Sequence, residues 1–506
     1  MVALSTDVMR WGRVNPQKTA LVYAGSRISY AELAGRVGRM AGVLHAQGLG
    51  RGDVVALLMK NSAAFIELSL AISHVGAIAL PINFRLGADE VAYILDHGQA
   101  KLVFVDEELA PSVGSARKMV IRSDAQRDTG VLARAEAEVA EACALEPSAV
   151  YRLMYTSGTT DRPKGVALTY QNYYWKCLDH IAVLGLDSET RLLVVGPLYH
   201  VGAFDLPGLA VLIAGGMLVV LRDFDPAQAL ASIESERLTG AWLAPVMLSR
   251  LLALPQRNDF NVSSLQWVVG GGERTPAERI RAFKSLFAGG RYIDAYGLTE
   301  SCSGDTFMEA GREIEKIGST GRAVPHVQIE IHNDDGNRLS AGQAGEICLR
   351  GPKVTTGYWR DPVRTAASFH GEWFRTGDVG LLDAEGFLYL TDRKKDMVIS
   401  GGENIASSEV ERVLYQHEGI EDAAVVGLPD ERWGERVIAV VVLRPGVEMD
   451  LAALQVHCAG KLGGFKIPKQ LVLRKELPRN PSGKILKRVL REELAAVSPQ
   501  PNREDG

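Results

Sequence analysis

The sequence is short of cysteine and carries no strong excess of charge of either sign. Its five cysteines are odd in number and show no Cys-x-x-Cys spacing, which excludes a disulfide framework and a zinc site built on paired cysteines. We expect them to be buried thiols in a reducing compartment. The formal net charge of −5 gives no overall attraction to nucleic acid or anionic lipid, so any charge that binds phosphate must be local.

Long hydrophobic runs are also missing. The longest run, residues 206–221, is interrupted by glycine and falls short of the roughly 20 residues that a membrane-spanning helix needs. It is predicted to form a buried helix, a turn and a strand. Residues 1–10 lack the basic and apolar regions of a secretory signal. We therefore expect a cytoplasmic protein with no stable membrane insertion and no nucleic-acid partner.

The chain does contain enough apolar residues for large cores. Hydrophobic residues make up 46% and charged residues 23% of its 506 residues, which is ordinary for a globular enzyme, and this length predicts two or more domains. Helical periodicity alternates with short apolar runs in the first part. Helices are expected at residues 30–45, 63–75 and 89–95, and strands at residues 53–59, 77–82 and 102–105. This alternation predicts an α/β fold with largely parallel, buried sheets.

The pattern differs further along the chain. Residues 123–147 are rich in alanine and glutamate, which predicts a surface helix and a linker. Residues 327–332 and 345–350 alternate apolar and polar on either side of a turn, which predicts an antiparallel pair with one solvated face. After the charged cluster at 392–396 we expect a compact α+β region, with helices at 408–416 and 450–461, strands at 423–426 and 437–443, and a disordered tail after residue 498.

The strongest local feature is a polar loop at residues 155–165, Tyr-Thr-Ser-Gly-Thr-Thr-Asp-Arg-Pro-Lys-Gly, which follows an apolar stretch. Its hydroxyls, its glycine and the cation of Lys164 can together wrap a polyphosphate. It is not a Walker A loop, because Pro163 precedes the lysine where that motif has glycine, and Gly165 follows it where the motif has serine or threonine. The mechanism of P-loop NTPases is therefore disfavoured.

Further motifs follow this loop along the chain. They are Pro-Leu-Tyr-His at 197–200, Gly-Gly-Gly-Glu at 270–273, Tyr-Gly-Leu-Thr-Glu at 296–300, Thr-Gly-Asp at 376–378, Asp-Arg-Lys-Lys-Asp at 392–396 with Ser-Gly-Gly at 400–402, and Pro-Ser-Gly-Lys at 481–484. With them the chain resembles, over nearly its whole length, the superfamily of adenylate-forming enzymes: acyl-CoA synthetases, peptide-synthetase adenylation domains and firefly-type luciferases. It is most similar to the AMP-forming acyl-CoA synthetase branch. It departs at Asp161, where the family loop usually has glycine, and we expect the loop tip to absorb this change.

The resemblance implies a domain organisation and a reaction. A large N-terminal domain, residues 1–394, would contain mixed, mostly parallel sheets and a distorted barrel. A small, mobile α+β domain, residues 395–506, would follow a hinge at Lys395. The implied reaction adenylates a carboxylic acid with ATP, releases pyrophosphate, transfers the acyl group to coenzyme A and releases AMP. A homodimer is left open.

The resemblance also implies a nucleotide site. The polar loop would hold the β- and γ-phosphates, Tyr296 would stack on adenine, and Asp378 would accept hydrogen bonds from the ribose hydroxyls. The implied nucleotide-binding residues are Thr156, Ser157, Gly158, Thr159, Thr160, Lys164, Gly272, Glu273, Arg274, Asp294, Ala295, Tyr296, Gly297, Thr299, Asp378, Leu390, Arg393 and Lys484.

Catalysis would depend on positioned positive charge, because a carboxylate must approach a phosphate of the same sign. The resemblance implies that Arg393 and Lys484 supply this charge and that Thr299 contacts the α-phosphate. It implies Glu300 and Thr156 as the residues at Mg²⁺.

The hinge would let one site serve two reactions. Rotation at Lys395 would withdraw Lys484 after the adenylate forms. It would bring to the site a glycine-containing segment that permits close approach of the pantetheine arm of coenzyme A: Ser400, Gly401 and Gly402.

The acyl pocket is expected near the Pro-Leu-Tyr-His motif. His200 would orient the carboxylate or gate the tunnel, with a packed core histidine as the alternative. The expected pocket residues are uncharged and mostly small or apolar, which favours an uncharged fatty, aryl or alicyclic acid: His200, Phe204, Met247, Val269, Gly272, Ala295, Gly297, Ser303 and Gly304. An amino-acid substrate would need an acidic partner for its ammonium group, and Asp205 is the one candidate.

Two alternatives stay open. A stand-alone adenylating enzyme would pass the acyl group to a separate carrier protein instead of coenzyme A. A degenerate relative would bind nucleotide without catalysis. The presence of Lys164, Glu300, Asp378, Arg393 and Lys484 together argues against the degenerate relative, because a binding module has no need for the mobile Lys484.

Overall fold

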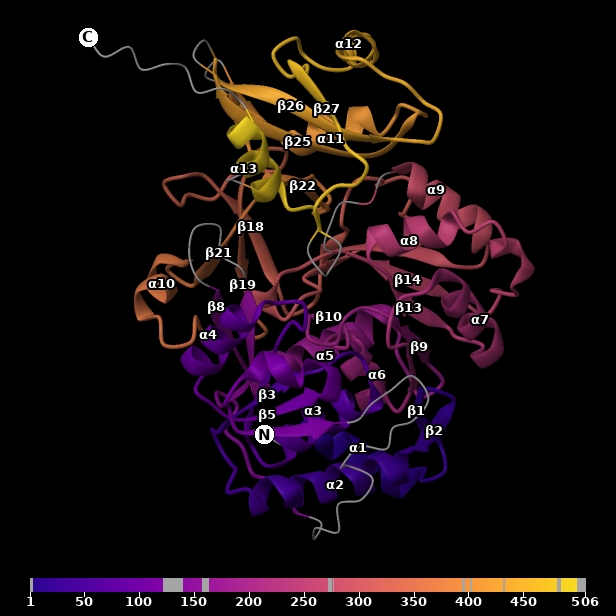
Figure 1. Ribbon diagram of the computed structural model, residues 1–506, viewed down its shortest axis with the longest axis vertical. Coiled ribbons are helices and arrows are strands. Elements are labelled where there is room, and N and C mark those ends of the chain that lie inside the picture. Colours follow the sequence, from indigo (N-terminus) through magenta and orange to yellow (C-terminus); the bar gives the residue numbers. More distant parts are fainter. Residues whose placement is uncertain are drawn as a thin grey trace. The chain divides into compact units, whose positions relative to one another are not determined.

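The computed structural model describes residues 3–121, 140–156, 163–271, 275, 277–393, 396–400, 403–430, 433–479 and 484–497, with the backbone alone at 392–393 and 403–404. The chain divides into two compact units. The first unit is Met1–Ile329 with Leu349–Arg375, and the second is Glu330–Cys348 with Thr376–Gly506. Both units combine helices with sheets (Figure 1), and the predicted α/β class is confirmed.

The largest sheet of the first unit is mostly parallel. In its described part it has nine strands in the order β17-β16-β15-β14-β13-β9-β12-β1-β2. The strands from β15 to β1 are parallel, whereas β2, β16 and β17 pair antiparallel with their neighbours. Their bounds are β1 Thr19–Tyr23, β2 Ser26–Ser29, β9 Arg191–Val194, β12 Met217–Val220, β13 Gly240–Trp242, β14 Trp267–Gly270, β15 Arg291–Tyr296, β16 Thr306–Phe307 and β17 Arg322–Ala323.

A second sheet of this unit has six described strands in the order β6-β5-β3-β4-β7-β8. Only β8 runs antiparallel to its neighbour. The bounds are β3 Val54–Leu58, β4 Ile78–Pro81, β5 Ala100–Asp106, β6 Lys118–Ile121, β7 Val150–Thr156 and β8 Lys164–Thr169. A short parallel pair, β10 Gly202–Ala203 and β11 Leu206–Pro207, lies outside these sheets.

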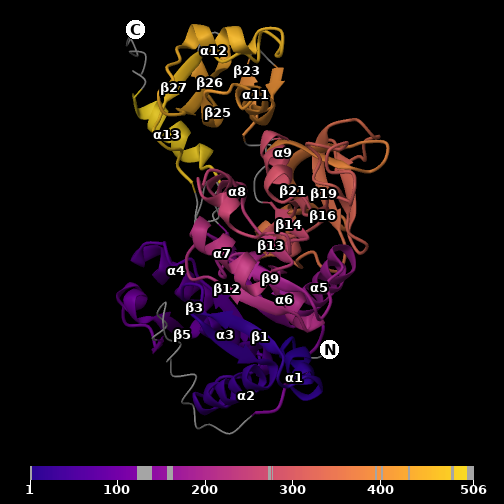
Figure 2. The ribbon, with the colours of Figure 1, turned by 90° about the vertical axis from the view of Figure 1, so that its right-hand side faces the viewer.

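Helix α3, Ala63–His74, lies between the two large sheets. Every one of its residues is buried, and it contacts β4 of one sheet and β1 of the other. Figure 2 shows α3 between β3 and β1. The sequence explains this position, because a helix with apolar residues around most of its circumference must be covered on all sides. Its one charged residue, Glu67, forms an ion pair of 2.9 Å with Arg36 on α2.

Most of the elements predicted for the first unit are present. Helix α2 spans Tyr30–Ala46 and begins with a capping box between Ser29 and Glu32, which satisfies two backbone N–H groups. The apolar run at 206–221 forms helix α6, Gly208–Ala214, then Gly215 with φ 86°, then β12, as predicted. The other helices of this unit are α1 Ser5–Val14, α4 Ala88–Gly98, α5 Tyr170–Leu184, α7 Pro226–Glu236, α8 Pro245–Leu252, α9 Ala277–Leu286 and α10 Pro362–Ala367, with 3-10 turns η1 Glu107–Val113, η3 Arg257–Asp259 and η4 Thr299–Ser301.

A further sheet contains the points at which the chain passes from one unit to the other. Its described strands have the order β18-β19-β21-β20, and β22 pairs antiparallel with β21. The two alternating segments predicted from the sequence are the neighbouring strands β18 and β19. The bounds are β18 Gln328–His332, β19 Gly345–Arg350, β20 Phe369–His370, β21 Trp373–Leu382 and β22 Leu388–Arg393.

The rest of the second unit is built around one sheet with two apolar faces. Alternate residues of β25 and β26 belong to two separate cores, so that Val425 lies in one core and Val426 in the other. Helices α11 and α13 lie on opposite sides of this sheet (Figure 2). The described strands have the order β24-β23-β26-β25, with β27 beside β26. The bounds are β23 Val398–Ser400, β24 Glu403–Ile405, β25 Ile420–Asp430, β26 Gly434–Leu443, β27 Gln470–Leu473, α11 Ser407–Leu414, α12 Leu451–Cys458 and α13 Lys487–Val497.

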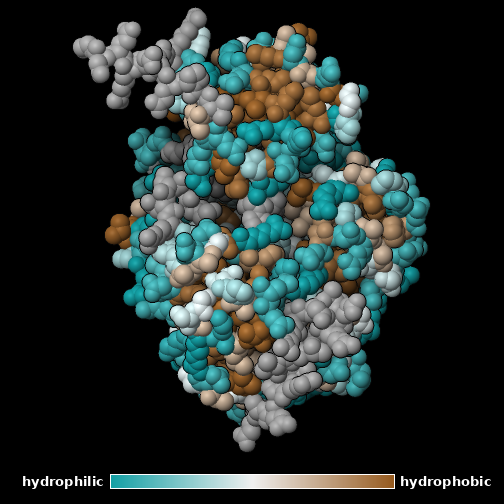
Figure 3. Space-filling model, in the orientation of Figure 1, coloured by the Kyte–Doolittle hydropathy of each residue, from teal (hydrophilic) through white to brown (hydrophobic). Residues whose placement is uncertain are grey.

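The surface of the described chain is mixed in polarity. On the face drawn in Figure 3, hydrophobic residues gather over β26 and β27, where Leu473 is 49% exposed. Elsewhere on this face hydrophilic and hydrophobic residues are interspersed, as is usual for globular proteins. Among the helices that the structure describes, none has both the length and the apolar character that crossing a bilayer requires.

Two sequence predictions are answered only in part. Four of the cysteines are buried as expected, but Cys143 is only partly buried. The surface helix predicted within 123–147 lies largely outside the described residues, since the structure describes this segment only from residue 140.

Candidate active site

Many of the predicted site residues follow parallel strands of the nine-stranded sheet. Strands β9, β13, β14 and β15 are parallel neighbours, so their carboxyl ends lie at one edge. The predicted residues that lie in these strands or in the segments after them are His200, Met247, Val269, Asp294, Ala295, Tyr296, Gly297, Thr299 and Glu300. The fold therefore brings residues that are far apart in the sequence to the edge where α/β proteins commonly bind ligands.

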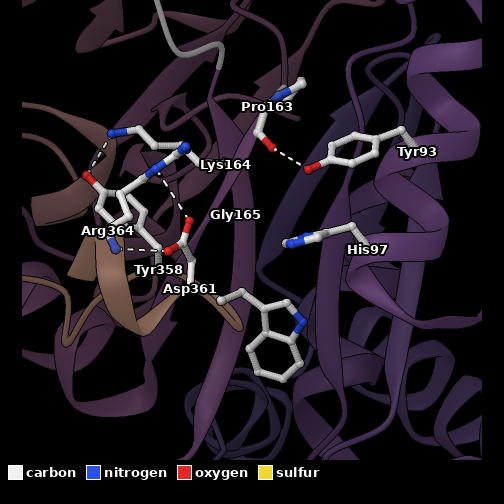
Figure 4. Close-up of a pocket in the computed structure, with 9 residues that line it drawn as sticks. Tyr93, His97, Pro163, Lys164, Gly165, Tyr358, Asp361 and Arg364 are labelled. Atoms are coloured by element: carbon white, nitrogen blue, oxygen red, sulfur yellow. Dashed lines mark hydrogen bonds and ion pairs between the residues drawn. The ribbon is translucent and has the colours of Figure 1, made fainter. Parts of the chain in front are cut away.

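The predicted phosphate loop connects β7 to β8. Thr156, which ends β7, stands opposite Lys164, which begins β8, in this antiparallel pair. The hydroxyl oxygen of Thr156 is buried and has no hydrogen-bond partner in the described part of the chain. Beside it, the Tyr93 hydroxyl donates a hydrogen bond of 3.2 Å to the Pro163 carbonyl (Figure 4). The two residues at the base of the loop, one with a hydroxyl and one with a cation, are thus paired in the sheet.

Lys164 meets both Glu300 and Tyr358. Its Nζ lies 3.0 Å from Oε1 of Glu300 and donates a hydrogen bond of 2.7 Å to the Tyr358 hydroxyl. Figure 4 shows Lys164 and Tyr358 directed toward each other. The Tyr358 hydroxyl donates in turn to the same Glu300 oxygen, at 2.9 Å. Glu300 is only 7% exposed, so a cation and a hydroxyl replace much of the water around its carboxylate. A cation and a carboxylate predicted from separate motifs therefore lie together.

Tyr358 is not among the residues predicted from the sequence. This residue reaches the pair because its segment runs along β8: Tyr358 forms a backbone bridge with Val166, and the Trp359 N–H donates to the Gly165 carbonyl at 2.7 Å. The only local signal was the Gly-Tyr-Trp triplet at 357–359, which is too ordinary to indicate a site. The contact joins residues that are 194 positions apart, and no short-range pattern reports it.

The turn after β15 has no room for a side chain at Gly297. A Cβ atom there would lie 2.3 Å from the backbone nitrogen of Gly304 and 2.9 Å from Cα of Ser303. Cys302, Ser303 and Gly304 form a run in the left-handed region, with φ of 57°, 65° and 68°. The turn thus folds back against Gly297, and three of the predicted pocket residues are in contact.

Gly297→Ala is expected to lower the free energy of unfolding by about 1–3 kcal/mol, because backbone atoms must move to admit the methyl group. Thermal denaturation measures the effect. Gly289→Ala is the matched control, since nothing lies within 4 Å of a Cβ atom at that position. A melting temperature of Gly297→Ala equal to that of the wild type would contradict the close contact.

A buried ion pair holds the same turn. Nζ of Lys353 lies 3.0 Å from Oδ1 of Asp305, and both side chains are 0% exposed. The ammonium group also donates to the carbonyls of Ser303, at 2.8 Å, and Gly304, at 2.6 Å. Burial raises the pKa of the Asp305 carboxyl, although Lys353 opposes this shift. The turn that carries Ser303 and Gly304 is therefore fixed by charge as well as by backbone contact.

Asp205, the sequence candidate for an ammonium partner, is already paired. Its carboxylate forms an ion pair with Arg152 and accepts a hydrogen bond of 2.9 Å from the Tyr173 hydroxyl. Arg152 and Asp205 are both 0% exposed. Because a buried cation already balances its charge, Asp205 is unsuited to receive a substrate ammonium group.

His200 and Phe204 differ in their surroundings. His200 is partly buried, and its Nδ1 accepts a hydrogen bond of 3.3 Å from the Gly202 N–H. Phe204 is fully buried, with the Arg152 guanidinium carbon 5.8 Å from its ring centroid. His200 is therefore more accessible than a packed core histidine would be, whereas Phe204 belongs to the core next to the buried ion pair.

In the second unit, Asp378 and Arg393 stand opposite each other in the pairing of β21 with β22. Asp378 is 8% exposed, and its N–H donates to the Thr376 hydroxyl at 3.1 Å. Leu390 lies three residues before Arg393 on β22, and Ser400 ends β23. Lys484 is partly buried. The structure thus pairs two of the predicted nucleotide-binding residues on adjacent strands.

Several predicted positions lie outside the described residues. They are Ser157, Gly158, Thr159, Thr160 and Asp161 of the phosphate loop, then Gly272, Glu273 and Arg274, the predicted hinge Lys395, and Gly401 and Gly402.

Comparison with known proteins gives family matches in both parts of the chain. Residues 8–359 match the AMP-binding enzyme family, and residues 409–484 match the AMP-binding enzyme C-terminal domain.

Similar proteins match over nearly their whole length. A feruloyl-CoA synthase of an Amycolatopsis species is 37% identical over 95% of this chain and 96% of its own. A long-chain-fatty-acid–CoA ligase of Mycobacterium tuberculosis is 34% identical over 96% of this chain and 97% of its own. Among solved structures, an o-succinylbenzoate CoA synthetase from Bacillus subtilis, in complex with its acyl-adenylate intermediate, aligns with a TM-score of 0.86 at 30% identity and covers 98% of both chains.

Proposed function

The chain belongs to the AMP-binding enzyme family, and on this premise we propose that it is an AMP-forming acid–thiol ligase. It would activate a carboxylic acid with ATP, release pyrophosphate, transfer the acyl group to coenzyme A and release AMP. The observation that carries the proposal is the meeting of Lys164 and Glu300, 3.0 Å apart, at the base of the phosphate loop. A cation for phosphate and a carboxylate for a metal ion are the two groups that a magnesium-bound triphosphate needs.

In the first half-reaction, an oxygen of the substrate carboxylate attacks the α-phosphorus of ATP. A bond forms between this carboxylate oxygen and the α-phosphorus. The bond between the α-phosphorus and the bridging oxygen of the leaving pyrophosphate breaks. Both reactants are anions, so the barrier falls when fixed cations face the charge that develops. We assign the β- and γ-phosphates to the loop with Lys164, the α-phosphate to Thr299, and the developing charge to Arg393 and Lys484.

In the second half-reaction, the deprotonated thiol of coenzyme A attacks the acyl carbonyl carbon, and AMP leaves. We propose that domains 1–394 and 395–506 rotate about Lys395 between the two steps. The rotation would replace Lys484 by a segment that receives the pantetheine arm: Ser400, Gly401 and Gly402. Exchange of groups at one site avoids competition for the same space.

The residues fit a Mg²⁺ ion that arrives with the phosphates. Among the described residues, no group of three or more His, Cys, Asp or Glu side chains could hold a metal ion without other ligands. Mg²⁺ commonly binds through one or two carboxylates together with substrate phosphates. Glu300 would suit this role, as would the Thr156 hydroxyl, which has no partner among the residues that the structure describes. When bound, the ion neutralises charge on the phosphate oxygens.

We propose an uncharged fatty, aryl or alicyclic acid as the substrate. The ion pair between Asp205 and Arg152 supports this choice. Asp205 is the residue predicted to bind a substrate ammonium group, and Arg152 already balances its charge. The relatives named above bear the names of feruloyl, long-chain fatty acyl and o-succinylbenzoyl groups, which indicates that the family accepts acids of very different shape. We also propose a cytoplasmic location, in keeping with five free thiols.

A pyrophosphate-release screen tests the function. The purified protein with ATP and Mg²⁺ receives a panel of fatty, aryl, alicyclic and amino acids, with and without coenzyme A. We expect release with one class of uncharged acid, and formation of acyl-CoA and AMP when coenzyme A is present. Pyrophosphate and adenylate without acyl-CoA would indicate a carrier protein as acceptor. ATP binding with no pyrophosphate from any acid would contradict the proposed ligase activity.

A further inference from the structure

Tyr358 makes contact with both of the charged groups at the base of the phosphate loop. Its hydroxyl accepts from Lys164 at 2.7 Å and donates to Glu300 at 2.9 Å. Its ring also faces the cation, since Nζ of Lys164 lies 4.2 Å from the ring centroid. Only a group that is both a donor and an acceptor can join an ammonium to a carboxylate in this way, and a hydroxyl is such a group.

The main chain fixes Tyr358 firmly. Its N–H donates to the Thr365 hydroxyl at 2.9 Å, and the same hydroxyl contacts the Asp361 carbonyl at 2.8 Å. Gly357, with φ 144°, has no space for a side chain, because a Cβ atom there would lie 2.4 Å from Thr365. The bridge to Val166 completes the support. These backbone contacts hold the tyrosine ring next to Lys164 and Glu300. The hydroxyl is therefore positioned to bind both groups.

The Tyr358 side chain is buried beside the charged pair. Tyr358 is 7% exposed, and burial, assisted by the adjacent Glu300 carboxylate, raises its pKa above the ordinary value. The Tyr358 ring also attracts the ammonium group of Lys164, because a cation over an aromatic ring is stabilised electrostatically.

We propose that Tyr358 is a positioning residue, which orients Glu300 for Mg²⁺ and holds Lys164 next to it until the phosphates of ATP arrive. This inference rests on the proposed function. In the free protein Lys164 is balanced by Glu300. On binding of Mg²⁺ and triphosphate, Lys164 would turn to phosphate and Glu300 to the metal ion, so that Glu300 would exchange its ammonium partner for Mg²⁺. The Tyr358 hydroxyl then stays as the neutral donor that keeps the Glu300 carboxylate in place.

Tyr358→Phe tests this role, because it removes the hydroxyl and keeps the ring. We expect the KM for ATP and the Mg²⁺ concentration for half-maximal rate each to rise about tenfold, as fits the loss of a hydrogen bond to a charged group. The KM for the acid should change less than twofold. Tyr170→Phe is the matched control, since it removes a buried tyrosine hydroxyl that donates to the Ser73 carbonyl at 3.2 Å. It should leave all three values near those of the wild type.

A double-variant cycle separates positioning from mere structural support. If Tyr358 acts through Glu300, its substitution should have little further effect on the Mg²⁺ requirement in a Glu300→Gln background. Calorimetric binding of MgATP gives a readout that needs no turnover. Wild-type protein that binds MgATP but activates no acid would refute the proposed function and leave the binding comparison intact. If Tyr358→Phe and the wild type depended equally on ATP and Mg²⁺, the positioning role would be overturned. The same holds if Tyr358→Phe raised the Mg²⁺ requirement equally in the wild-type and Glu300→Gln proteins.

Discussion

Lys484→Ala is expected to slow adenylate formation by about a hundredfold or more while leaving ATP binding largely unchanged. In the proposed reaction a carboxylate must reach the α-phosphorus of an anionic triphosphate. A fixed ammonium group between them lowers the barrier by several kcal/mol, and its loss should appear in the rate of this step. Binding of ATP depends on many other contacts, so its dissociation constant should change little. Acetylation of Lys484 would act in the same direction, because it removes the charge.

The measurement is pyrophosphate release with the acid found by the screen, in the absence of coenzyme A. Calorimetry gives the affinity for MgATP in parallel. Arg488→Ala is the control, since it removes a cation a few residues away that is 61% exposed and pairs with Glu492 on the surface. It should keep nearly wild-type rates. A Lys484→Ala variant that released pyrophosphate at the rate of the wild type would show that Lys484 has no role in adenylation.

Lys353→Met is expected to destabilise the first unit by about 3–5 kcal/mol, the usual result when one partner of a buried ion pair is removed. Asp305 would be left in a fully buried position without its cation. Burial already raises the pKa of the Asp305 carboxyl with Lys353 in place, which indicates how unfavourable an isolated carboxylate would be there. The carbonyls of Ser303 and Gly304 would lose the donor that holds their turn.

Thermal denaturation and the yield of folded protein report this loss. The double variant Lys353→Met with Asp305→Leu should regain part of the stability, because removing both charges also removes the cost of burying them. Arg488→Met is the surface control and should cost less than about 1 kcal/mol, since exposed ion pairs contribute little. If Lys353→Met melted like Arg488→Met, the ion pair could not be what fixes the turn.

Local sequence patterns predicted much of the fold. Helix α3 is an example, because the apolar stretch at residues 63–75 predicted a helix and the structure has one at Ala63–His74. The run at 206–221 is another, since the glycine at 215 predicted the turn between a short helix and a strand. Such features depend on periodicity and on glycine, which act over a few residues.

The candidate site was predictable to the extent that it is made of motifs. Lys164 and Glu300 come from two separate stretches with recognisable residue types, and the structure brings them within 3.0 Å. Tyr358 was not predictable, because the triplet around it has no distinctive chemistry. The sequence also left open whether Asp205 binds a substrate or pairs with a cation of the protein. A lone aspartate next to an expected pocket is consistent with either role.

The sequence alone determined the alternation of helices and strands, the family resemblance and the residue types available for phosphate and metal binding. The tertiary structure alone decided which of these residues meet: Arg152 neutralises Asp205 across 53 positions, and Lys353 holds the Ser303 carbonyl across 50. The physical reason is the range of the interactions. Propensity and periodicity act between neighbours in the chain, whereas the pairing of buried charges depends on which segments the closed core places in contact.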